Sequence, residues 1–368
     1  MISDKIHRSE SLQRIAAPLL AWYGKNCRDL EWRREPLPYY VWVSEIMLQQ
    51  TRVEAVKPYF SRFIGALPDI PSLAACPEEK LLKLWEGLGY YNRVRNLKKA
   101  AQLVVREYEG ALPGDVNALR RLPGIGSYTA GAIASIAFGI PAPAVDGNVL
   151  RILSRIDANE SCIDDGKVKA AFEDRIRMFL QARMEQIHPG RFNQALMELG
   201  ALVCAPNGKP SCEDCPVEEM CLARKRNLTG SIPVRKEKKA RRQEEKTVLV
   251  ITDRSNVLIG KRQDKGLLAG LWEFPNYSGH LSYGEALLEA KKHGVSALRI
   301  QPLPDDEHIF THVTWRMSGY LIQAEEMDAL RPGERFKAVR IEKIEEEYSI
   351  PSAFSRFSAY LKGEEGTR

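Results

Sequence analysis

Residues 122–126 read Leu-Pro-Gly-Ile-Gly, and residues 145–151, about twenty positions further on, read Val-Asp-Gly-Asn-Val-Leu-Arg. The segments on either side of the first motif, residues 115–122 and 127–138, have the spacing of two short helices. Glycines between two helices permit a tight turn and let a phosphate approach the backbone amides. The helix that follows adds unpaired N–H donors and the positive end of its dipole. This stretch predicts a helical pair whose connection is either an ordinary tight turn or, with the second motif beside it, a contact to a nucleic-acid backbone that does not read its sequence.

Helical spacing extends outward from this pair, from Ser11 to about Arg226. Between residues 224 and 246 Lys and Arg dominate and no apolar period survives, which is typical of a linker. This segment is either a solvated tether or a contact to phosphates. The sequence predicts an all-helical region that ends in a basic linker.

Beyond the linker the apolar period becomes two. Residues 248–251 and 257–259 predict a hairpin, residues 272–274 and 312–322 predict further strands, and residues 284–293 predict a helix. The C-terminal region is therefore expected to be an α+β domain.

Composition limits the classes of protein that fit. A chain of 368 residues with 44% apolar residues is long enough for two cores, and a net charge of +6 weakly favours a polyanionic partner. The N-terminus lacks the features of a secretory signal, and no apolar run approaches the roughly 18 residues of a membrane span. We expect a soluble protein without a membrane partner, in a compartment that keeps thiols reduced.

Four of the seven cysteines form a C-x7-C-x2-C-x5-C pattern. Thiolates this close together can converge on one metal centre, and unligated structural cysteines are the less favoured alternative. Zinc prefers two separated pairs, whereas an asymmetric tight loop suits an iron–sulfur cube. The predicted ligands are Cys204, Cys212, Cys215 and Cys221.

The glycine motif, the segment around Asp146 and the cysteine loop together resemble the endonuclease III and MutY superfamily of helix-hairpin-helix DNA glycosylases. The resemblance implies a 4Fe–4S cluster as cofactor and double-stranded DNA as partner. The first cysteine gap has seven residues where the superfamily usually has six. Pro206, Gly208 and Pro210 lie in this gap, so we expect a slightly larger surface loop to absorb the insertion.

Residues 41–51 read Val-Trp-Val-Ser-Glu-Ile-Met-Leu-Gln-Gln-Thr and resemble the MutY family nearly residue for residue. By that resemblance Glu45 is the acid that protonates adenine N7, and its apolar neighbours would raise its pKa. Asp146 would stabilise the sugar cation or form a transient covalent adduct, and Asn148 would orient water or Asp146. Strand-cutting relatives carry a lysine where this chain has Tyr128. A phenol cannot form a Schiff base, so the expected enzyme is monofunctional.

The same resemblance implies a set of substrate and DNA contacts. Some line the adenine pocket or read its edge, some fill the stack that the flipped base leaves, and two glycines face the backbone. They are Trp32, Arg33, Gln194, Leu48, Gln50, Thr51, Tyr90, Gly124 and Gly126. Trp32 and Tyr90 could equally be aromatic residues of the hydrophobic core.

Residues 271–275 read Leu-Trp-Glu-Phe-Pro and, with Gly279 and Glu285, resemble the start of a Nudix box. The following helix has one acid and two lysines, so magnesium would lack ligands and a binding module is expected. In the MutY family this module recognises 8-oxoguanine. Its expected reader here is Phe310, Thr311 and His312, with threonine in place of the usual serine and the hydroxyl retained.

We therefore expect a multi-domain protein: an all-α helix-hairpin-helix glycosylase domain at 1–226 with the cluster loop 204–221, a basic linker at 227–245, and an α+β Nudix-like domain at 246–368. It would remove adenine opposite 8-oxoguanine or guanine in base excision repair, as a monomer, in a bacterial cytoplasm at the nucleoid. The alternatives are a bifunctional endonuclease III-like glycosylase and lyase for oxidised pyrimidines, an iron–sulfur DNA-binding or redox-sensing protein, and a Nudix hydrolase with an added DNA-binding domain.

Overall fold

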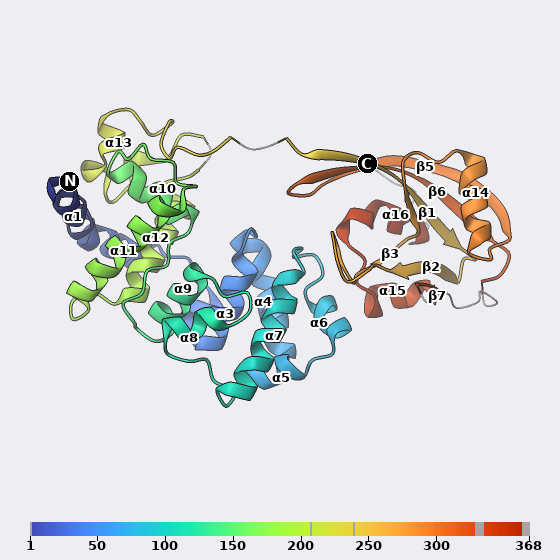
Figure 1. Ribbon diagram of the computed structural model, residues 1–368, viewed down its shortest axis with the longest axis horizontal. Coiled ribbons are helices and arrows are strands. Elements are labelled where there is room, and N and C mark those ends of the chain that lie inside the picture. Colours follow the sequence, from blue (N-terminus) through green and yellow to red (C-terminus); the bar gives the residue numbers. More distant parts are fainter. Residues whose placement is uncertain (1, 207, 238–239, 328–334, 363–368) are drawn as a thin grey trace. The chain divides into compact units, whose positions relative to one another are not determined.

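A computed structural model describes residues 2–206, 208–237, 240–327 and 335–362 (Figure 1). The chain forms two compact units. The first comprises Met1–Ala75 and Arg95–Glu237, and the second comprises Cys76–Val94 and Lys238–Arg368. Residues 76–94 thus group with the C-terminal region, although the sequence places them in the helical domain; the boundaries at 226 and 246 stay a prediction. Among the described helices, none is both long and apolar enough to cross a lipid bilayer.

The first unit is helical, as the sequence predicts. One of its cores is made by four helices that bury Leu12, Leu153, Ile176 and Leu196, among others. Its elements are α1 (Ile2–Asn26), α2 (Glu31–Arg34), α3 (Pro38–Leu48), α4 (Val53–Ala66), α5 (Ile70–Ala75), most of α7 (Asn92–Glu107), α8 (Val116–Arg121), α9 (Ser127–Ala137), α10 (Gly147–Ile156), α11 (Gly166–Arg183), α12 (Pro189–Leu202), the short turns η1 (Cys212–Asp214) and η2 (Glu218–Met220), and α13 (Leu222–Lys225).

The predicted helical pair is confirmed as α8 and α9. Asp115 caps α8, with its side chain accepting from the Ala118 amide at 2.7 Å. Gly124 has φ of +79°, and a Cβ at this position would lie 2.9 Å from the Cβ of Asn96. The turn therefore requires glycine at residue 124 both for its backbone conformation and for its close packing.

The second unit contains a mixed sheet in the order β3-β2-β1-β6-β5, with β4 on β1 and β7 on β2. Strands β1 and β6 are parallel and the other pairs are antiparallel. Its elements are α6 (Glu78–Leu84), β1 (Arg242–Thr252), β2 (Asn256–Lys261), β3 (Trp272–Glu273), β4 (Asn276–Ser278), α14 (Tyr283–Lys292), β5 (Ala297–Ile309), β6 (Val313–Ala324), β7 (Phe336–Arg340), α15 (Ile341–Glu347), η3 (Ser352–Phe354), α16 (Ser355–Ala359) and η4 (Tyr360–Lys362).

Both faces of β1 are buried in its second half, from Thr247 to Thr252, which explains the continuous apolar run there. Val248 and Val250 pack in a core that includes Phe357 of α16, whereas Leu249 and Ile251 pack against α14. The predicted hairpin, the strands at 272–274 and 312–322 and the helix at 284–293 are confirmed. The sequence gives no signal for β5, because that strand is largely exposed and carries Pro302 and Pro304.

Both ends of the predicted linker at 227–245 make ordered contacts. Arg155 donates to the carbonyls of Thr229 and Ile232, and Ile163 donates its amide to Val234, so this part packs on the first unit. At the other end β1 already begins at Arg242. Lys238 and Lys239 lie outside the described residues.

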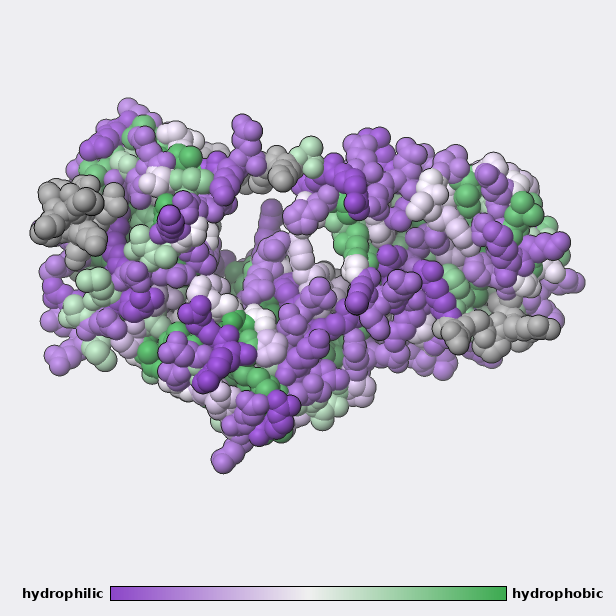
Figure 2. All heavy atoms as spheres, viewed as in Figure 1, coloured by the Kyte–Doolittle hydropathy of each residue, from purple (hydrophilic) through white to green (hydrophobic). Residues whose placement is uncertain are grey.

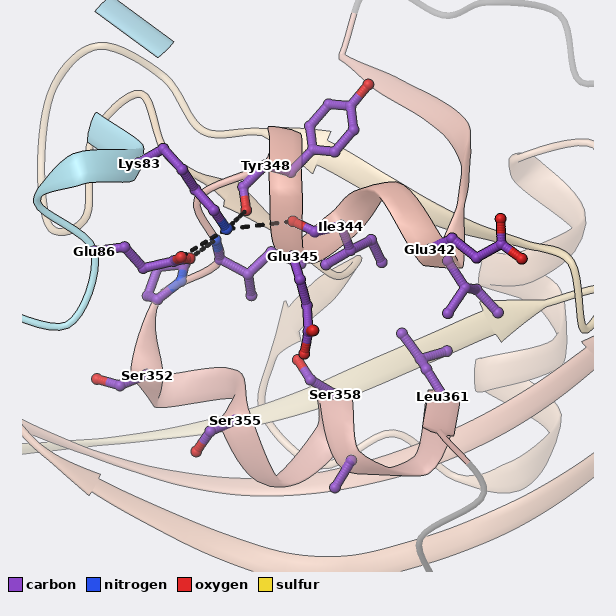
Figure 3. A pocket seen from close by; sticks show the side chains of 14 residues that line it. Lys83, Glu86, Glu342, Ile344, Glu345, Tyr348, Ser352, Ser355, Ser358 and Leu361 are labelled. Atoms are coloured by element: carbon purple, nitrogen blue, oxygen red, sulfur yellow. Dashed lines mark hydrogen bonds and ion pairs between the residues drawn. The ribbon is translucent and has the colours of Figure 1, made fainter. Parts of the chain in front are cut away.

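Two residues of the segment 76–94, Lys83 and Glu86, line a pocket of about 640 Å³ together with residues 341–361 of the same unit. Figure 3 shows their side chains in this pocket. Lys83 Nζ donates to the carbonyls of Tyr348 at 3.1 Å and Ile344 at 3.4 Å, at the end of α15. Glu86 pairs with Lys83 and accepts from the Ile350 amide at 3.0 Å. Outside such buried contacts the face in view is mainly hydrophilic (Figure 2).

Candidate active site

Glu45 lies in the middle of α3, a helix that is buried along most of its length. The residue is only 6% exposed, although a glutamate is normally a surface residue. The phenol of Tyr128, at the start of α9, donates to Glu45 Oε2 at 2.6 Å. The sequence suggested each of these two residues separately, and the structure brings them into contact.

The pKa of the Glu45 carboxyl is raised toward neutral pH, which favours its protonated form. Burial raises its pKa to about 7, with the Asp146 charge acting in the same direction and the Tyr128 hydrogen bond and the Arg33 charge opposing it. Burial also raises the pKa of Tyr128 well above its ordinary value, so this residue remains a phenol and a donor. Because Tyr128 donates to Oε2, Oε1 is the atom free to carry the proton.

Asp146 caps α10 with both carboxylate oxygens engaged. Oδ1 accepts from the Val149 amide at 2.8 Å and Oδ2 accepts from Asn148 Nδ2 at 2.7 Å. Burial raises its pKa, while these hydrogen bonds and the Arg151 charge act against that rise. Asp146 and Glu45 are thus two interacting carboxyls with different partners, an arrangement suited to acid and electrostatic roles.

Asn148 links Asp146 to the cysteine loop. Its Oδ1 accepts from Arg151 Nη2 at 2.9 Å, and Arg151 Nε donates to the Cys204 carbonyl at 2.8 Å. Arg151 also donates to the Gly200 carbonyl, so its guanidinium is fixed on three sides. The sequence motifs did not single out Arg151; its signal is an arginine one turn after Asn148 on a helix that is buried along most of its length.

The four predicted cysteine ligands line one small cavity, together with Arg155 and Arg224. Arg155 Nη1 lies 3.2 Å from Cys204 Sγ, so a positive charge faces the sulfurs. Among the described residues, no group of three or more His, Cys, Asp or Glu side chains is close enough to hold a metal ion as it stands. Four thiols that line one cavity are a ligand set that either a tetrahedral metal ion or an iron–sulfur group can use. The extra residue of the first gap leaves Cys204 and Cys212 on that cavity.

The residues expected in the base pocket make partly buried polar contacts. Arg33 Nη2 donates to Glu198 Oε2 at 2.7 Å, and Tyr23 donates its hydroxyl to Gln194 Oε1 at 3.1 Å. The amide group of Gln194 therefore has its oxygen engaged. Trp32 is buried with its ring edge-on to Phe60 at 4.9 Å. No motif of the sequence singled out Tyr23 or Glu198, because their partners lie far away along the chain.

The residues expected to fill the space that a flipped base leaves in the DNA base stack differ in their exposure to solvent. Gln50 follows α3 with φ of +59° and is exposed, whereas Leu48 and Thr51 are half-buried. Positive φ in a non-glycine residue is a strained conformation that is common at functional sites. Tyr90, in the second unit, also has positive φ, at +48°, and is 48% exposed.

The expected reader forms the tight turn between β5 and β6. The Phe310 amide donates to the Val313 carbonyl at 2.8 Å, and the Phe310 ring packs between His308 and Trp315. The Thr311 hydroxyl is exposed and lies 2.8 Å from the hydroxyl of Tyr90 within the same unit. The carbonyl of His312 accepts from the Arg242 amide.

The two acids of the incomplete Nudix box are engaged within their own helix. Glu285 forms a capping box with Ser282, and Glu289 pairs with Lys292 at 2.6 Å. Neither carboxylate is directed to a shared cation site by these contacts.

Comparisons with known proteins agree with this geometry. Residues 43–178 match the model of the HhH-GPD superfamily of base excision DNA repair proteins, and residues 247–360 match that of the NUDIX domain. The chain is 35% identical to the adenine DNA glycosylase of Mus musculus, over 86% of this chain and 72% of that protein. It is 34% identical to that of Buchnera aphidicola, over 83% and 85%.

The chain belongs to the adenine DNA glycosylase family.

The family assignment identifies the protein as a DNA glycosylase of base excision repair, with a helical domain and a Nudix-like domain. A solved structure of a thermostable thymine-DNA glycosylase is similar to the helical part, with a TM-score of 0.52 and 26% identity over 59% of this chain and 98% of that one. The residues that match the HhH-GPD model include the candidate site at Glu45, Tyr128 and Asp146.

Proposed function

We propose that this adenine DNA glycosylase removes adenine opposite 8-oxoguanine, and opposite guanine, by hydrolysis without cutting the strand. The observation that carries the proposal is the buried Glu45 carboxyl, with a pKa near 7 and Tyr128 on one oxygen. Such an acid is protonated near neutral pH, where it can give a proton to a leaving base.

In the proposed reaction Glu45 protonates adenine N7 as the bond from C1′ to N9 breaks, so that the base leaves neutral. The Asp146 carboxylate stabilises the positive charge on the sugar, directly or through a transient covalent adduct, until water adds at C1′. Asn148 and the Val149 amide keep that carboxylate in place. Tyr128 supplies no amine for a Schiff base, which supports a monofunctional reaction.

The cysteines are proposed to hold a 4Fe–4S cluster, which would stabilise the loop structurally when bound. The fit is supported by the cavity that the four thiols share with Arg155 and Arg224. We expect the purified protein to be yellow-brown and to contain iron and sulfide in the amounts of one 4Fe–4S cluster. A colourless protein that contains zinc would contradict the assignment.

The proposed reader of 8-oxoguanine is the turn of Phe310, Thr311 and His312. The exposed hydroxyl of Thr311 supports a hydrogen bond to the damaged base. Thr311→Ser keeps the hydroxyl and should keep the preference for 8-oxoguanine over guanine. Thr311→Val keeps the shape and should lower that preference; equal preferences in both variants would contradict this reader.

The decisive test is product identity in single turnover on a duplex with one adenine opposite 8-oxoguanine. We expect free adenine, with strand breakage only after alkali treatment. Direct strand cleavage, or a preference for a duplex with an oxidised pyrimidine, would overturn the proposal in favour of a bifunctional endonuclease III-like activity.

A further inference from the structure

Glu198 is a fully buried carboxylate on α12 that binds two arginines. Its Oε1 accepts from the amide and Nε of Arg28, each at 2.8 Å, and its Oε2 accepts from Arg28 Nη2 at 2.8 Å and Arg33 Nη2 at 2.7 Å. Four charge-assisted hydrogen bonds of this length define a single geometry for the side chains involved.

The Arg33 guanidinium is held on three sides. Besides Glu198, its Nη1 donates to the Arg28 carbonyl at 3.1 Å, and its planar group lies 5.7 Å from the centre of the Tyr23 ring. Arginine suits such a position because its planar fork is always charged and can both stack and hydrogen-bond. The orientation of Arg33 is therefore set by its partners rather than by its own flexible chain.

Arg33 also acts on the catalytic acid. The groups that influence the Glu45 carboxyl are Tyr128 from α9, Asp146 at the start of α10, and Arg33 from α2. Arg33 is the cation among these three, and its charge lowers the pKa of Glu45. A direct ion pair between Arg33 and Glu45 would hold Glu45 ionised, and an ionised carboxylate cannot donate a proton to the base.

We propose that Glu198 is a positioning residue for adenine excision: by binding Arg33 it keeps the guanidinium off the Glu45 carboxyl, which thereby retains its proton. The inference rests on the proposed role of Glu45 as general acid. Glu198 also compensates part of the positive charge that Arg28 and Arg33 bring into the unit. A buried glutamate thus preserves the proton of Glu45 by binding the arginine that would otherwise pair with Glu45.

The test compares single-turnover rates of adenine release from the duplex with 8-oxoguanine across pH, for the wild type and Glu198→Gln. Glutamine has nearly the same shape but no charge, so Arg33 would act more strongly on Glu45. We expect the alkaline limb of the profile to move down by about one pH unit, which lowers the rate about tenfold above the limb and leaves it near wild type well below it.

Two further variants separate charge from structure. In Glu198→Gln combined with Arg33→Met, the alkaline limb should return toward or above its wild-type position, whatever the maximum rate. Asp157→Asn breaks a comparably buried ion pair with Arg175 in the same unit, and neither residue acts on Glu45. This matched control should leave the position of the limb unchanged.

A profile of Glu198→Gln that is lowered by one factor at every pH would overturn the proposal, because that result indicates a purely structural role. If Glu198→Gln fails to fold, Arg33→Met alone should move the limb upward, and an unmoved limb would equally overturn it. Failure of the underlying function has another signature: an alkaline limb that persists in Glu45→Gln would show that Glu45 is not the acid.

Discussion

Two buried glutamates of the helical unit have pKa values that are shifted in opposite directions. Glu45 is 6% exposed with a pKa near 7, whereas Glu198 is 0% exposed with a pKa near 2. Burial raises the pKa of both carboxyls. At Glu198, hydrogen bonds from Arg28 and Arg33 outweigh that rise, while Glu45 accepts from the neutral phenol of Tyr128. Because burial raises the pKa of both carboxyls, the difference between them comes from their partners: two arginines at Glu198 and a neutral phenol at Glu45.

The largest expected effect comes from removing the proton donor. Glu45→Gln should lower the single-turnover rate of adenine release about 10³-fold, because an amide cannot protonate the leaving base. The matched control is Glu54→Gln on α4, which removes an exposed glutamate that pairs with Lys57 and should leave the rate unchanged. A loss of less than about tenfold in Glu45→Gln would mean that Glu45 is not the proton donor and does not differ from Glu198 in that role.

The second effect concerns folding. Glu198→Gln should lower the free energy of unfolding by about 3 kcal/mol, because two partly buried arginines lose their counter-charge. The lowered pKa of Glu198 means that this stabilisation is fully present above the unfolded pKa of 4.5 and is lost as the pH falls toward about 2. Urea unfolding at neutral and acid pH measures it; an unchanged midpoint at neutral pH contradicts the ion-pair contribution.

The third effect is the pH dependence of the wild-type rate. Glu45 must be protonated, so activity should fall about tenfold per pH unit above its pKa of about 7. Asp146 must be ionised, so activity should also fall at low pH and the profile should be bell-shaped. The two apparent values belong to the interacting pair. A rate that does not fall as the pH rises well above 7 would show that the reaction does not depend on a proton held by Glu45.

The smallest expected effect comes from removing the neutral hydrogen-bond donor of Glu45, the phenol of Tyr128. Tyr128→Phe removes the hydrogen bond that lowers the pKa of Glu45, so the alkaline limb should move upward by less than about one pH unit. The rate below the limb should change only several-fold. Movement of the limb in the opposite direction would show that Tyr128 does not act on Glu45 through this bond.

Much of the fold follows from local signals. The glycine turn at residues 122–126 predicts α8 and α9, and the change of apolar period predicts β1 and β2. Strand β5 escapes because Pro302 and Pro304 and an exposed surface obscure its period. The attachment of residues 76–94 to the second unit escapes as well, because it depends on single contacts such as Lys83 to the end of α15.

The sequence by itself identified Glu45, Asp146, Tyr128 and the four cysteines as candidates, because motifs keep reactive side chains at fixed spacing. Only the tertiary structure decided that Glu45 is protonated near neutral pH, since its state depends on burial and on a phenol 83 residues away along the chain. Glu198 and Arg33, 165 residues apart, meet for the same reason. Local spacing determines which groups are available, whereas long-range packing sets the distances and the solvation on which their charges depend.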